Sequence, residues 1–118
     1  MKIYQKIQNS KNAEFNLVVS CGSKDEKSGQ IGISHLLEHM NLAFAKQTSH
    51  WINVSGYTTY EYTQYSIKCK NSLNDVKRVI EKLKNIIEGK ELLESNLSGA
   101  QNDVIKEILE QRENSFFP

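Results

Sequence analysis

The sequence predicts an α+β fold, in which helices pack on one face of a mostly antiparallel sheet. Segments typical of strands and of helices are mixed along the chain, and no regular crossover separates the strands as it would in a parallel sheet. The clearest strand pattern is followed directly by a strongly amphipathic helix pattern. A chain of 118 residues is long enough for one domain, so we expect residues 1–118 to form a single, partial or minimal domain.

The N-terminal part of the chain predicts two strands and a loop. Residues 1–8 alternate apolar and polar side chains, and residues 9–12 have the composition of a turn. Residues 15–21 are rich in valine and leucine, which is typical of a buried strand. Residues 22–29 are polar, charged and bounded by glycines, so we expect a loop there.

A helix and two further strands are expected next. The helix covers about residues 30–45. A short strand follows over residues 51–54, with a break or bulge at residues 55–56. Residues 58–69 form the clearest strand pattern, because tyrosine, threonine and isoleucine dominate it.

Two more helices complete the predicted fold. Ser72 caps the first, Asp75 completes a capping box with it, and Gly89 ends the helix. Its apolar stripe has helical spacing and consists of Leu73, Val76, Ile80, Leu83 and Ile87. The second helix covers about residues 92–114, with Ser98 as an alternative start. Its expected core face consists of Leu97, Val104, Ile105 and Ile108.

The composition argues against several classes of function. The formal net charge is +1 and the only arginines are Arg78 and Arg112, so we expect neither a nucleic-acid nor an anionic-membrane partner. No apolar run approaches the length of a membrane span, and the first residues lack the core of a signal peptide. We therefore expect a soluble, cytoplasmic protein in which Cys21 and Cys69 are free, buried thiols.

The most informative segment is residues 32–40, which read Gly-Ile-Ser-His-Leu-Leu-Glu-His-Met. It places His35 and His39 four residues apart, and therefore on one face of a helix, with Glu38 beside them. Two imidazoles so placed can bind one metal ion, and a carboxylate can take a proton from metal-bound water. H-x-x-E-H is the inverted form of a zinc-peptidase motif.

The same residues also fit an ordinary amphipathic helix with two histidines near its surface. The flanking positions are mostly apolar, namely Ile31, Ile33, Leu36, Leu37 and Met40. Burying imidazoles and a carboxylate among such residues without partners is costly, and a metal ion would supply the partner. The context therefore favours a metal site.

Three blocks of sequence, in order, resemble the N-terminal catalytic domain of the pitrilysin-type metallopeptidases, the family of insulin-degrading enzyme and the mitochondrial processing peptidase. They are residues 21–26 with 32–40, residues 55–65, and residues 104–108. The resemblance implies a truncated half-domain of that family and a zinc endopeptidase activity. It also implies that His35, His39 and Glu107 bind Zn²⁺ and that Glu38 is the general base.

The third ligand also has an interpretation from the residues alone. Glu107 lies beside the apolar positions Val104 and Ile108, where a carboxylate is costly unless it is paired. It also fits a solvated helix face, since Glu110 and Glu113 follow at helical spacing. Glu110 is the alternative ligand.

The resemblance further implies a peptide substrate that binds in extended form to a sheet edge near residues 51–54. Trp51, Ser55 and Tyr57 are the expected substrate contacts, although Trp51 and Tyr57 also fit a core position. Ser55 stands where the family has asparagine.

Other departures concern length and charge. Glu107 follows His39 by 68 positions, a gap shorter than the family's, and the shortening falls between Ala45 and Trp51. Ala100 stands where the family has a second acidic residue, and Asp103 is a partial substitute. Family enzymes close two homologous halves around the substrate, so a homologous half-domain or an oligomer is the expected partner. Two alternatives follow: a non-catalytic assembly or binding subunit, and a structural relic without metal.

Overall fold

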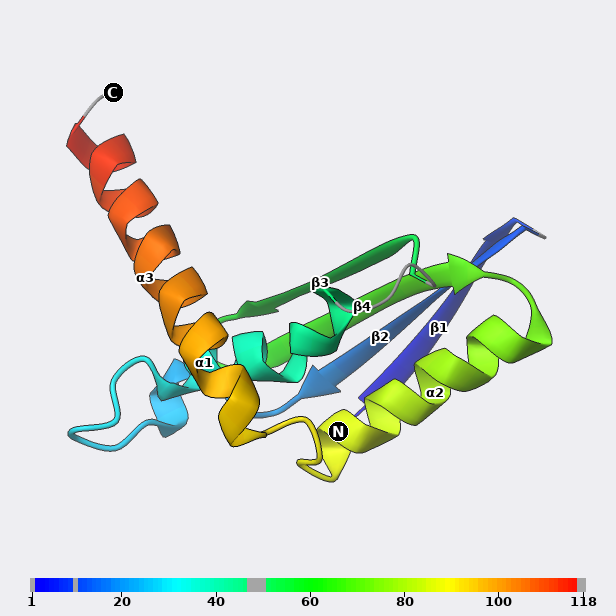
Figure 1. Ribbon diagram of the computed structural model, residues 1–118, viewed down its shortest axis with the longest axis horizontal. Coiled ribbons are helices and arrows are strands. Elements are labelled where there is room, and N and C mark those ends of the chain that lie inside the picture. The colour runs from blue at the N-terminus through cyan, green and yellow to red at the C-terminus, as the bar shows by residue number, and fades with distance from the viewer. Residues whose placement is uncertain (1, 10, 47–50, 117–118) are drawn as a thin grey trace.

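A computed structural model describes residues 2–9, 11–46 and 51–116 of the chain (Figure 1). Its strands form one antiparallel sheet in the order β1-β2-β4-β3. They are β1 (Lys2–Asn9), β2 (Asn12–Val19), β3 (Asn53–Thr58) and β4 (Thr63–Lys70). The helices are α1 (Ile33–Asn41), α2 (Leu73–Ile87) and α3 (Glu94–Phe116), with short 3-10 turns η1 (Ser23–Asp25) and η2 (Ala43–Lys46). The predicted α+β class is confirmed.

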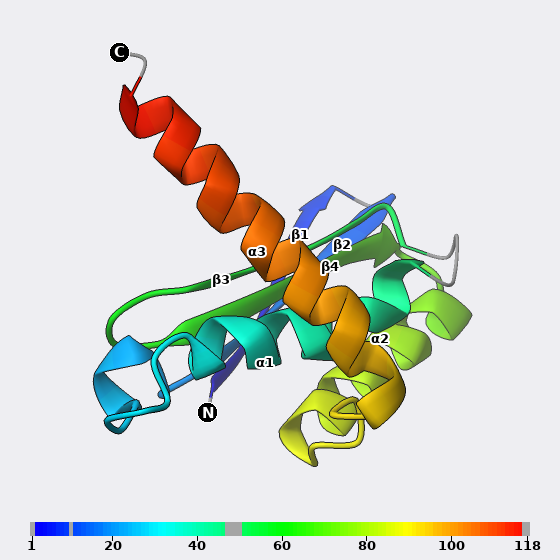
Figure 2. The same cartoon turned by 60° about the vertical axis from the view of Figure 1, so that its left-hand side comes forward.

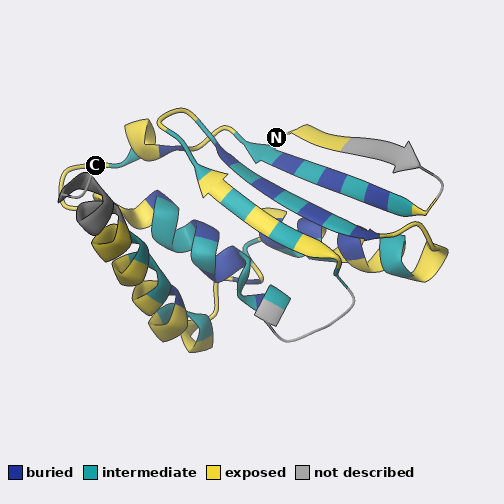
Figure 3. Ribbon diagram, turned by 90° about the horizontal axis from the view of Figure 1, so that it is seen from above, coloured by how far each residue is buried: buried dark blue, intermediate teal, exposed yellow. Residues whose placement is uncertain are grey.

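The helices lie on one side of the sheet, and α3 crosses α1 and then extends away from the rest of the molecule (Figures 1 and 2). The central strands β2 and β4 pair with Phe15 opposite Ile67 and Leu17 opposite Tyr65. Because side chains alternate along a strand, every second residue of each central strand is buried under the helices (Figure 3).

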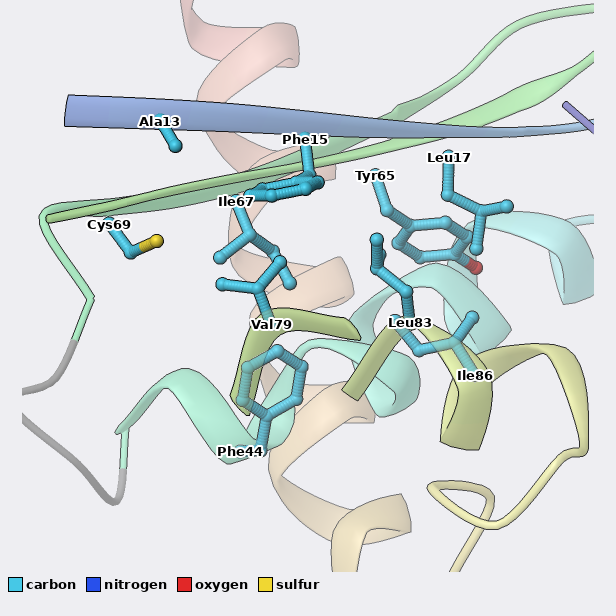
Figure 4. Close-up of a cluster of buried hydrophobic side chains, with 10 residues drawn as sticks. All are labelled: Ala13, Phe15, Leu17, Phe44, Tyr65, Ile67, Cys69, Val79, Leu83 and Ile86. Atoms are coloured by element: carbon cyan, nitrogen blue, oxygen red, sulfur yellow. The ribbon is translucent and has the colours of Figure 1, made fainter. Parts of the chain in front are cut away.

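The core fills the space between these strands, α2 and η2 (Figure 4). The sheet and η2 contribute Ala13, Phe15, Leu17, Phe44, Tyr65, Ile67 and Cys69. From α2 come Val79, Leu83 and Ile86. The predicted stripe of α2 was therefore partly wrong, because Leu73, Ile80 and Ile87 are exposed. The true stripe is rotated by about one residue, since α2 packs against β4 and β2 and presents Val79 and Ile86 to them.

The ends of α2 are as predicted. The Ser72 hydroxyl accepts a hydrogen bond from the Asp75 backbone N–H at 3.3 Å, and Ser72 is the N-cap. Gly89 has a φ of +73°, a left-handed conformation that commonly ends a helix.

Four other expectations need correction. Residues 55–56 lie inside β3 rather than at a break, and the turn at residues 59–62 divides the long strand expected over 58–69. Helix α1 is shorter than residues 30–45 because a 3-10 turn replaces its last part. Cys21 is free but exposed, whereas Cys69 is free and buried as expected.

Helix α3 also differs from its prediction. It begins at Glu94 and runs through Ser98 without a break. Ile105 and Ile108, expected in the core, are about half exposed, and Ala100 is buried instead. The reason is that α3 packs mainly on the narrow surface of α1 and not on the sheet. Residues 47–50, which include part of the shortened connection, lie outside the described residues.

Candidate metal centre

Helix α1 carries the motif, and its start is fixed from outside the helix. Gly32, the N-cap, has a φ of +90° and offers no side chain to cap the first turn. The Glu26 carboxylate does so instead, accepting hydrogen bonds from the backbone N–H of Gly32 at 3.1 Å and of Ser34 at 2.8 Å. These two hydrogen bonds hold the pKa of Glu26 below its usual value. Glu26 thus fixes the end of α1 that precedes His35.

The side chains of His35, His39 and Glu107 converge between α1 and α3. The Nε2 atoms of the two histidines are 3.2 Å apart. The carboxylate of Glu107 lies with Oε2 at 2.8 Å from Nε2 of His35 and with Oε1 at 3.2 Å from Nε2 of His39. Two imidazole nitrogens that face each other this closely can share only one proton. The arrangement therefore suits a cation that both nitrogens can bind.

These distances agree with the geometry of a zinc site. Neighbouring ligand atoms on a tetrahedral zinc ion with bonds of roughly 2.0–2.1 Å are about 3.3 Å apart. One ligand atom from each of His35, His39 and Glu107 can be chosen so that all lie within 4.8 Å of one another. Two imidazole nitrogens and a carboxylate oxygen are also a ligand set that zinc uses in hydrolases. These three side chains can hold a metal, and Glu110 is not part of the cluster found among the described residues.

Glu38 is buried next to this cluster, with only 4% of its surface exposed. Its Oε1 accepts a hydrogen bond from the Thr58 hydroxyl at 3.0 Å, and its Oε2 lies 3.7 Å from Nε2 of His39. Burial raises the pKa of the Glu38 carboxyl, while the hydrogen bond from Thr58 and the nearby histidines oppose this shift. Oε1 of Glu38 is therefore hydrogen-bonded to β3, and Oε2 faces the histidines.

Close packing of β3 on α1 depends on a residue without a side chain. A Cβ atom at Gly56 would lie 2.7 Å from Cδ1 of Leu42, 3.2 Å from the Gln64 carbonyl oxygen and 3.3 Å from Cγ of Glu38. Gly56 thus lets the strand approach the helix closely enough for Thr58 to reach Glu38.

A groove of about 500 Å³ opens beside the cluster. Its lining combines β3, α1 and α3 and includes His35, Glu38, Gly56, Tyr57, Thr58 and Glu107. Of the three residues predicted to contact substrate, Tyr57 is thus at the groove, although its hydroxyl donates to Oε1 of Gln64 at 2.9 Å. Ser55 is exposed on the same strand. Trp51 packs edge-on against Phe44 at a ring distance of 5.6 Å, next to the core.

Two residues of the site were not singled out from the sequence. Glu26 and Thr58 both lie inside the sequence blocks that resemble the family, and this location could have identified them. Neither belongs to a recognisable motif, because Glu26 acts on the start of α1 and Thr58 acts on Glu38, both of which are distant in sequence.

A family model described as insulinase, peptidase family M16, matches residues 2–116 of the chain. The chain is therefore a member of the insulinase (M16) peptidase family, and the resemblance found in the sequence is confirmed. Searches of curated proteins and of solved structures give no match. Family membership supports a peptidase or a related function. No helix in the described part of the chain is both long and apolar enough to cross a membrane.

Proposed function

We propose that this chain is a zinc-dependent peptidase, or the metal-bearing part of one, that hydrolyses peptide bonds. The observation that carries the proposal is the convergence of His35 and His39 from α1 with Glu107 from α3. The three side chains come from helices distant in sequence and form the donor set that the family implies. Residues 1–118 then act as one metallopeptidase domain.

In this proposal, Nε2 of His35, Nε2 of His39 and one carboxylate oxygen of Glu107 hold the zinc ion. When bound, zinc would polarise the substrate carbonyl and make the attacking water more acidic. Glu38 accepts the proton of the attacking water at Oε2, the oxygen nearer to His39. The same carboxyl group then donates that proton to the leaving amine. Thr58 keeps Glu38 in place through Oε1.

The edge strand β3 supports a mode of substrate binding. It is the last strand in the sheet order, and its residues line the groove beside the cluster. An extended peptide can add to such an edge through backbone hydrogen bonds. Tyr57, and with it Ser55 and Trp51, are the proposed side-chain contacts near this edge.

A related proposal is that a partner half-domain covers the site, and that the chain alone is an assembly or binding subunit. The exposed apolar residues that line the groove favour it. Ile31 is 92% exposed, and Ile108 on α3 is about half exposed. Such residues are costly to leave in water.

Glu38→Gln separates the proton-transfer role from metal binding. Incubating the zinc-loaded protein with unstructured peptides and identifying products by mass spectrometry should show cleavage by the parent and by Glu61→Gln, an exposed control. Glu38→Gln should retain zinc and lose cleavage, because the amide cannot take up the proton. Unchanged cleavage by Glu38→Gln would reject the role of Glu38. Cleavage that requires a purified homologous half-domain would support the subunit version.

A further inference from the structure

We propose that Asp103 is a positioning residue that orients His39 for metal binding. The inference rests on the proposed zinc site and adds a residue that lies outside the three ligands. Metal-binding histidines usually donate their second ring nitrogen to a carboxylate or carbonyl, and that partner fixes both the tautomer and the orientation of the ring.

The geometry at His39 has this form. Nε2 faces His35 and Glu107, as described above. On the other ring nitrogen, Nδ1 lies 3.9 Å from Oδ2 of Asp103. This is an ion-pair distance and not a direct hydrogen bond, and one water molecule can bridge it. Nδ1 of His39 therefore faces a different carboxylate from those near Nε2.

Helix α3 supplies both Asp103 and Glu107. Asp103 and Glu107 are four residues apart, so they lie on the same face of the helix, one turn from each other. Among the described residues, the carboxylates within ion-pair distance of His39 are Glu38, Asp103 and Glu107. Glu38 and Glu107 approach Nε2, which leaves Asp103 as the acidic side chain at Nδ1.

The surroundings of Asp103 explain why it has this role in this chain. A cavity of about 230 Å³ lies beside His39 and is lined by Asp103 and by small side chains, including Ala43, Gly99 and Ala100. Ala100 is buried and brings no charge to this cavity. The negative charge that the site receives on this side therefore comes from Asp103.

The chemical consequence concerns the proton on His39. When a cation takes the place of the proton at Nε2, a carboxylate near Nδ1 stabilises the remaining ring proton on Nδ1. It also lowers the cost of placing a positive charge next to the ring. Losing the carboxylate should weaken zinc binding without removing a ligand.

Zinc affinity, measured by competition with a chromogenic chelator, tests the proposal. Asp103→Ala should weaken affinity by about 10–100-fold, Asp103→Asn by less, and Asn102→Ala, an exposed neighbour, by less than about two-fold. Circular dichroism checks that each variant is folded. Zinc binding by Asp103→Ala within about two-fold of the parent would overturn the proposal.

The ring proton of His39 gives a second measurement that a purely structural role would not change. In the zinc-loaded protein Nε2 of His39 would be occupied, and the ring proton would lie on Nδ1, the nitrogen that faces Asp103. Proton and nitrogen-15 NMR should therefore show an Nδ1–H signal that shifts and exchanges faster with solvent in Asp103→Ala than in the parent. An unchanged signal with an unchanged exchange rate would contradict the inference. A parent chain that binds no zinc would overturn the proposed function, whereas a parent that binds zinc together with an unaffected Asp103→Ala variant would overturn only the role of Asp103.

Discussion

The two helices that form the candidate metal centre are held in very different ways. Helix α1 is fixed at its start by Glu26, and it packs against β3 through Gly56. Helix α3 packs mainly on α1 and extends beyond it (Figure 2). The side chains reflect this contrast, since that of Glu38 is 5% exposed and that of Glu107 is 44% exposed.

This contrast shows which side chains of the centre are positioned by the sheet and its contacts. The sheet and its contacts preset His35, His39 and Glu38, whereas the position of Glu107 depends on how α3 docks on α1. We therefore expect substitutions on the α1 side to change stability, and substitutions on the exposed face of α3 to have little effect on it.

The largest effect is expected from deleting a buried side chain of α1. Met40 is 7% exposed, and Met40→Ala should lower the free energy of unfolding by about 2–5 kcal/mol, because it leaves a cavity. Leu109 on α3 is 53% exposed, and Leu109→Ala should change the free energy of unfolding by less than about 0.5 kcal/mol. Urea denaturation measures both. Equal losses would contradict the contrast between the helices.

A pair of glycines should give effects of opposite sign. Gly56→Ala places a methyl group 3.2 Å from the backbone carbonyl oxygen of Gln64 on β4 and 2.7 Å from Cδ1 of Leu42, so β3 or its neighbours must shift, and it should cost about 1–3 kcal/mol of stability. Gly99 lies in α3, where a methyl group would meet no neighbouring side chain, so Gly99→Ala should add about 0.5–1 kcal/mol. Thermal unfolding followed by circular dichroism compares the two variants. A stabilising Gly56→Ala would show that β3 does not need this close approach.

The buried carboxylate of Glu38 should reduce the stability of the metal-free protein at neutral pH. Burial raises the pKa of Glu38 in the folded state, so the folded protein holds this proton more tightly than the unfolded chain does. The stability that comes from this tightly held proton is present at low pH. It is lost as the pH rises from 4.5, the ordinary pKa of a glutamate, through the raised pKa of Glu38.

Glu38→Gln should therefore raise the melting temperature of the metal-free protein at pH 7, and the gain should vanish below pH 4.5. Glu110→Gln, a change at an exposed position of α3, is the matched control. A lower melting temperature for Glu38→Gln at pH 7 would contradict this account of the buried carboxylate.

The smallest effect is expected from the cap of α1. The hydrogen bonds from Ser34 and Gly32 lower the pKa of Glu26 in the folded state. The contribution of Glu26 to stability is therefore present above pH 4.5 and is lost as the pH falls through the lowered pKa. Glu26→Gln should lower the urea midpoint at pH 7 and have less effect at acidic pH. Glu61→Gln, at an exposed position, provides the comparison. Equal midpoints for both variants at pH 7 would contradict the capping role.

Much of the fold was predictable because local signals decided it. Ser72 and Gly89 marked the ends of α2, and the spacing of His35 and His39 marked a helical face. The assignments that failed depend on tertiary packing. Periodicity alone could not tell which of two overlapping stripes of α2 faces the sheet. Nor could it tell that Ile105 and Ile108 would stay exposed on a helix that packs mainly on α1.

The centre shows the same division. The residues of the motif were evident from the sequence, and Glu107 was chosen over Glu110 only through the family resemblance. The roles of Glu26 and Thr58 depend on contacts between segments 8 and 20 residues apart in the sequence. Such contacts have no periodic pattern, so only the folded arrangement reveals them.

The most direct test of the central claim is a zinc titration of the metal-free chain followed by calorimetry. We expect one zinc ion per chain for the parent and for Glu110→Ala, and strongly weakened binding for His35→Ala, His39→Ala and Glu107→Ala. Full-affinity binding by Glu107→Ala would contradict the claim that side chains of α1 and α3 hold one ion together.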